Sequence, residues 1–201
     1  MTNTTAAPLA RSAGPLALVA GLVLVVSDLV TWSTIDAADK VGTSLDPIYQ
    51  LSGVAYMIGF VLLALALVAL HGRQSAKAGA FGGFAFACAL TGTFLLGGDL
   101  WFETFVVPWT AAHLPEIYEA PKDGLLVVGA LASYLSFAVG WALFGIASFR
   151  AGVFPRLLCV ALAIAGLLGF HALVPPYGVP IGLVVAGLGL WVMRQPQTSA
   201  A

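Results

Sequence analysis

Two acidic residues, Asp99 and Glu103, lie four residues apart in the otherwise apolar stretch GGDLWFETFVVPW. On a helix, residues at this spacing share one face. Two close carboxylates repel each other when both are charged, so one of them retains a proton near neutral pH. A protonated carboxylic acid in an apolar, aromatic-lined site is a general acid. The pair therefore predicts a catalytic proton donor; the alternative is a solvated pair at the end of a helix.

A third acidic residue, Asp28, lies inside an apolar run and has no basic residue near it in the sequence. Counting back from Trp32 places Asp28 about one helical turn, or about 6 Å, inside a membrane interface. A carboxylate at that depth is costly unless it faces a bundle interior or a water-filled cavity. We therefore expect the three catalytic candidates, Asp28, Asp99 and Glu103, to face one another or a common pocket.

Four aromatic residues and one histidine are the candidates for binding a substrate, namely Trp32, Tyr56, Trp101, Tyr134 and His171. An aromatic face stabilises a cation by about 0.5–2 kcal/mol, which suits a reaction that develops positive charge. The alternatives are that the tryptophans anchor the chain at a membrane interface and that the histidine is an interfacial hydrogen-bonding residue. No two histidines have the spacing of metal ligands, and no phosphate-binding or dinucleotide-binding motif occurs. Neither a metal nor a cofactor is therefore expected.

The composition predicts which elements position these residues. Of the 201 residues, 60% are hydrophobic and 8% are charged, against roughly a quarter charged in a soluble domain. The mean hydropathy is +1.00, which indicates an integral membrane protein. The net charge of −1 offers no basic surface for nucleic acid. Cys88 and Cys159 lie in apolar runs and are interpreted as small buried hydrophobic residues.

Hydropathy predicts an all-α fold in which residues 1–201 form one domain, a bundle of six transmembrane helices. The predicted segments are Gly14–Ser33, Tyr49–His71, Gly79–Asp99, Gly124–Phe149, Pro155–His171 and Val179–Met193. The count becomes seven if the 99–115 segment forms a separate helix. The first apolar run is longer than that of a typical signal peptide, so we interpret it as the first segment. Small residues are predicted at helix contacts, namely Gly79, Gly82, Gly83, Gly124, Gly129, Gly182, Gly187 and Gly189.

The basic residues predict the orientation of this bundle. Six of the eight fall at the N-terminus, in the second and fourth connections and at the C-terminus: Arg11, Arg73, Lys77, Arg150, Arg156 and Arg194. Only Lys40 and Lys122 fall in the first and third connections. Because connections rich in lysine and arginine stay cytoplasmic, both termini are predicted to be cytoplasmic. The expected location is a bacterial cytoplasmic membrane.

Two resemblances add to this interpretation. The turn SFRAGVFPRLL resembles that of small multi-span bacterial membrane proteins without an assigned activity. The overall format is similar to the membrane-embedded terpene cyclases of fungal meroterpenoid and bacterial indole-terpenoid pathways. That resemblance implies intramembrane carboxylates that act as Brønsted acids on an epoxide or an alkene. It covers the format only, because that family has seven helices and no signature aligns residue by residue.

The sequence thus favours a membrane enzyme, a lyase or isomerase that starts the cyclisation or isomerisation of an isoprenoid-like lipid by protonation. Its expected partners are membrane lipid and a hydrophobic small-molecule substrate, and nucleic acid is not expected. One alternative is a proton-coupled carrier of small solutes, since intramembrane acids suit that function too. The other is a non-catalytic membrane partner protein.

Overall fold

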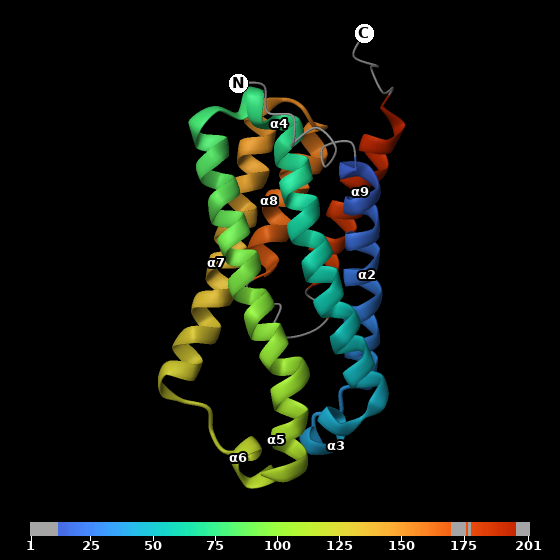
Figure 1. The fold of residues 1–201 in the computed structure, drawn as a ribbon, viewed down its shortest axis with the longest axis vertical. Helices are drawn as coiled ribbons and strands as arrows, with labels where there is room; N and C mark the ends of the chain where they lie inside the picture. Colours follow the sequence, from blue (N-terminus) through green and yellow to red (C-terminus); the bar gives the residue numbers. More distant parts are fainter. Residues whose placement is uncertain (1–11, 170–175, 177, 196–201) are drawn as a thin grey trace.

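The computed structural model describes residues 12–169, 176 and 178–195, which form a helical bundle without strands in these ranges (Figure 1). The described helices, in chain order, are α2 (Ala13–Thr34), α3 (Lys40–Leu45), α4 (Pro47–Trp101), the π-helix η1 (Phe102–Val106), α5 (Val107–His113), α6 (Pro115–Glu119), α7 (Gly124–Ala151), α8 (Arg156–Leu168) and α9 (Val179–Arg194). The prediction of an all-helical fold is confirmed.

Helix α4 consists of two arms that meet at Gly79, where the chain turns back on itself (Figure 1). Gly79 has φ 60° and ψ −164°, a conformation that only glycine adopts readily. The second arm continues without a break through η1 and α5 to His113. No separate helix therefore begins at residue 99, so the 99–115 segment does not add a seventh helix to the predicted six. We call the end of the bundle with this turn the Gly79 end and the opposite end the α3 end.

Three described helices are long and apolar enough to cross a membrane: Ala13–Thr34, Pro47–His113 and Gly124–Ala151, with mean hydropathies of 2.2, 2.5 and 1.8. Helices α8 and α9 are apolar but contain only 13 and 16 residues. At about 1.5 Å per residue they measure about 20 and 24 Å, less than the roughly 30 Å of a hydrocarbon core. Both lie at the Gly79 end, and α2, α4 and α7 extend beyond them toward the α3 end (Figure 1). The six-segment count therefore stays a prediction.

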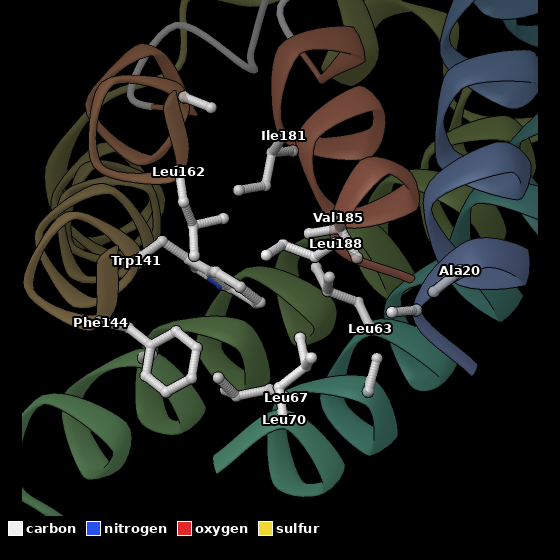
Figure 2. Close-up of a cluster of buried hydrophobic side chains, with 14 of the residues drawn as sticks. Ala20, Leu63, Leu67, Leu70, Trp141, Phe144, Leu162, Ile181, Val185 and Leu188 are labelled. Carbon is white, nitrogen blue, oxygen red and sulfur yellow. The ribbon is translucent and has the colours of Figure 1, made fainter. Parts of the chain in front are cut away.

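A core of large apolar side chains fills the centre of the bundle (Figure 2). Trp141 of α7 is fully buried there, and its Nε1 donates a hydrogen bond to Thr93 Oγ1 at 3.0 Å. Figure 2 shows residues of α4, α8 and α9 around this ring, among them Leu63, Leu67, Leu162, Val185 and Leu188. The bundle thus has a packed interior in its Gly79 half.

Glycines set the closest helix contacts. A Cβ added at Gly21 of α2 would overlap the backbone of Gly182 and Ala186 in α9, and one added at Gly140 of α7 would overlap the backbone of Ala89 in α4. The predicted contact role is confirmed for Gly182 and Gly189. It is wrong for Gly79, Gly83, Gly124 and Gly129, because a Cβ added at any of these positions would meet no atom of another described helix within 4 Å. Sequence reasoning missed Gly14, Gly21, Gly92, Gly140, Gly145 and Gly166, because an apolar sequence does not show which side of a helix faces its neighbour.

We expect Gln74→Leu to stabilise the protein. Gln74 is fully buried at the Gly79 end, and within the described residues neither polar atom of its amide has a hydrogen-bond partner. A buried unsatisfied polar group costs about 1–3 kcal/mol, so its removal should raise the free energy of unfolding by about 1 kcal/mol. Thermal unfolding in detergent measures the change.

The matched control is Gln50→Leu. Gln50 Nε2 donates a hydrogen bond to the carbonyl oxygen of Ser44 at 3.1 Å, so this variant should unfold at a lower temperature than the wild type. A lower unfolding temperature for Gln74→Leu as well would show that the buried amide has a stabilising partner.

Candidate functional site

A cavity of about 270 Å³ lies at the α3 end, between α2, the two arms of α4, η1 and α7. We call it the polar pocket. The side chains that line it and can do chemistry are Asp28, Tyr49, Gln50, Tyr56, Glu103, Lys122 and Tyr134. Four of the predicted site residues, Asp28, Tyr56, Glu103 and Tyr134, therefore share one cavity.

Asp28 joins the polar pocket to the first turn of α9. The residue is only 3% exposed, and its Oδ2 accepts hydrogen bonds from the backbone N–H groups of Gly178 at 2.9 Å and Val179 at 3.1 Å. The N-terminus of a helix carries a partial positive charge, so this position favours the carboxylate anion. A side chain at Gly178 would overlap the Tyr56 hydroxyl, so glycine is needed for this approach. Asp28 thus has a structural role as well as a place in the pocket.

Glu103 lies on the π-helix η1 and forms an ion pair with Lys122, Oε1 to Nζ, at 3.7 Å. The side chains are 37% and 53% exposed, so the pair contributes at most about 1 kcal/mol to stability. Single π-helical turns inside longer helices often occur at functional sites. The cation beside Glu103 comes from the loop that precedes α7, and the sequence analysis did not assign it to the site.

Asp99 lies one turn before Glu103, in the last turn of the second arm of α4. It does not line the polar pocket, but its carboxyl group lies near the side chain of Tyr134, which is 3% exposed and does line the pocket. The Asp99 carboxylate also interacts electrostatically with Glu103 and Lys122. Asp99 and Glu103 therefore lie close together, as expected, and Tyr134 both lies near Asp99 and lines the pocket.

The two predicted tryptophans lie elsewhere. Trp32 is 56% exposed and Trp101 is 52% exposed, and neither lines the polar pocket. Their outward position suits amphipathic rings at a membrane interface. Tyr49 lines the pocket instead and was not among the predicted site residues. His171 lies outside the described residues.

The wall of the polar pocket carries two carboxylates, three phenol rings, two threonine hydroxyls, one amide and one ammonium group. The Lys122 ammonium offsets the charge of Glu103, and the second carboxylate, Asp28, leaves a net negative charge. This arrangement favours a ligand or intermediate that bears positive charge. The described residues contain no group of three or more His, Cys, Asp or Glu side chains arranged to hold a metal ion. No protein-family model, curated protein or solved structure matches this chain.

Proposed function

We propose that the chain is a multi-pass integral membrane protein of a bacterial cytoplasmic membrane, with six helical segments and both termini cytoplasmic. The three long apolar helices support this. Basic residues from two connections also gather at the Gly79 end, where the Arg150 guanidinium lies 5.0 Å from the centre of the Phe81 ring. In this orientation the polar pocket lies in the outer half of the membrane.

Reporter fusions test this orientation. A fusion after Lys77 or Arg150 should give a cytoplasmic signal, and one after Lys40 or Pro121 should give an external signal, because the basic residues concentrate in the first pair of connections. At each position, an alkaline phosphatase fusion reports an external location and a green fluorescent protein fusion reports a cytoplasmic location. An external signal after Arg150 would contradict the six-segment topology.

We further propose that the protein starts the cyclisation or isomerisation of an isoprenoid-like lipid by protonation. The observation that carries this proposal is the polar pocket, in which acids and phenol rings from α2, α4, η1 and α7 meet in a largely apolar bundle. Protonation of an epoxide oxygen breaks a C–O bond, and an alkene's π electrons then form a new C–C bond. The resulting cation loses a proton to a base, so the net reaction is an isomerisation.

The contacts of the three acids suggest how they divide this work. Asp28 accepts two backbone N–H bonds and Glu103 pairs with Lys122, so both suit the role of anions that stabilise the cation. Asp99 lies near the Tyr134 hydroxyl, which suits transfer of a proton from Asp99 through that hydroxyl to the substrate.

A direct assay tests this function. The purified protein is reconstituted into lipid nanodiscs and incubated with a C20 isoprenoid that carries an epoxide at one end. We expect a product of unchanged mass with a new ring, detected by gas chromatography and mass spectrometry. A second incubation uses a polyprene that lacks the epoxide. If both compounds are recovered unchanged, acid-initiated chemistry is contradicted.

One observation favours a proton-coupled carrier as the second candidate. Helix α9 is short, and its N-terminus meets the Asp28 carboxylate beside the polar pocket. Secondary transporters use the N-termini of discontinuous helices for substrate binding near the middle of the membrane. Proteoliposomes with an internal pH dye distinguish the two functions, since a carrier moves protons when solute is added and the enzyme does not.

A further inference from the structure

A second hollow lies beside the polar pocket, between the two arms of α4. Its volume is about 510 Å³, and we call it the apolar groove. The first arm contributes Met57, Phe60 and Val61, and the second contributes Phe94, Gly98 and Trp101. Val61 and Phe94 are 56% and 64% exposed, so the groove faces outward, toward lipid in the proposed orientation.

The apolar groove and the polar pocket share a thin wall. Tyr56 and Leu100 line the pocket, and the residues that follow them, Met57 and Trp101, line the groove. The Tyr56 ring packs edge-on against the ring of Phe60, which also lines the groove, with centroids 5.5 Å apart. The two hollows are therefore neighbouring parts of one region.

The surface of the groove suits hydrocarbon. Among the described lining residues, Thr93 is the only one with a hydroxyl, amide or charged side chain, and the indole N–H of Trp101 is the other polar group. Thr93 Oγ1 donates to the carbonyl oxygen of Ala89 at 2.7 Å and accepts from Trp141 Nε1 at 3.0 Å, so it is turned into the bundle. Gly97 and Gly98 leave the floor without side chains, and a Cβ added at Gly98 would meet no described atom within 4 Å.

We infer that the apolar groove holds the hydrocarbon chain of a lipid whose polar, reacting end lies in the polar pocket. From Leu90 to Trp101 the second arm rises about 16 Å, roughly half the thickness of a hydrocarbon core. The lipid enters from the membrane between the arms of α4. The chemical identity of the lipid's reacting end rests on the proposed function. The position of its hydrocarbon chain rests on the geometry of the apolar groove alone.

The test uses the C20 isoprenoid epoxide with a photoreactive diazirine at the end opposite the epoxide. After illumination of the protein in nanodiscs, peptide mass spectrometry locates the label. We expect it on groove residues in 57–68 or 90–101. An added Cβ at Gly98 meets no described atom within 4 Å, so Gly98→Leu can place a side chain in the groove. It should lower this labelling about tenfold or more, since displacing even two buried methylene groups is worth that factor.

Gly83→Leu is the matched control, because Gly83 is also an exposed position on the second arm of α4 with no described atom within 4 Å. Both changes replace a helical glycine, so both favour the helix equally. Labelling outside the groove, or labelling that Gly98→Leu leaves unchanged, would overturn the inference. Because labelling needs no turnover, groove labelling without any cyclised product would contradict the proposed function and leave the inference standing.

Discussion

Asp99→Asn is expected to lower the rate of product formation by about 10²–10⁴-fold, the usual contribution of a positioned general acid. Asparagine keeps the size and polarity of the side chain near Tyr134, but it has no transferable acidic proton. The folded protein should therefore persist while the chemistry stops. Initial rates with the isoprenoid epoxide measure the effect, and size-exclusion chromatography in detergent checks the fold.

Two variants sharpen this prediction. Tyr134→Phe removes a hydroxyl that lies near Asp99 on the wall of the polar pocket, so it should resemble Asp99→Asn in rate. Glu103→Gln should have a smaller effect, because Glu103 is 37% exposed and water can reach its position. If Asp99→Asn and Asp28→Asn both turn over the epoxide at the wild-type rate, the carboxylates are structural and the enzyme proposal is wrong.

The places of the helices along the chain could be predicted because apolar runs are long and end at polar residues. The predicted segment Gly14–Ser33 differs from α2 by one residue at each end, and the turn between the arms of α4 lies at Gly79, where the third predicted segment begins. The same count predicted that Asp28, Asp99 and Glu103 lie at one end of the bundle, and the structure places them there. Their depth in a membrane stays a prediction.

Rotation about the helix axes and contacts distant in the chain could not be predicted. A helix that is apolar all round gives no periodic signal for its buried side, so the sequence did not show that Trp32 and Trp101 lie outside the polar pocket. Lys122 gave no signal because it lies in a polar loop. The bonds from Asp28 to residues 178 and 179 join segments about 150 positions apart and depend on where the short helix α9 begins.

Asp28→Leu should destabilise the protein by loosening α9. Leucine cannot accept the N–H groups of Gly178 and Val179, and each buried donor left without a partner costs about 1–3 kcal/mol. Asp28→Asn retains a carbonyl oxygen as acceptor, so it should lose only the charge interaction with the helix terminus, about 0.3–2 kcal/mol. Thermal unfolding measures the loss of stability, and hydrogen exchange of the first turn of α9 shows where it occurs.

Asp39→Leu is the control. Asp39 caps the exposed end of α3 by accepting a hydrogen bond from the Gly42 N–H at 2.7 Å, so its replacement should leave exchange in α9 unchanged. If exchange in α9 is unchanged in Asp28→Leu as well, Asp28 does not hold the helix terminus, and only its role in the polar pocket remains.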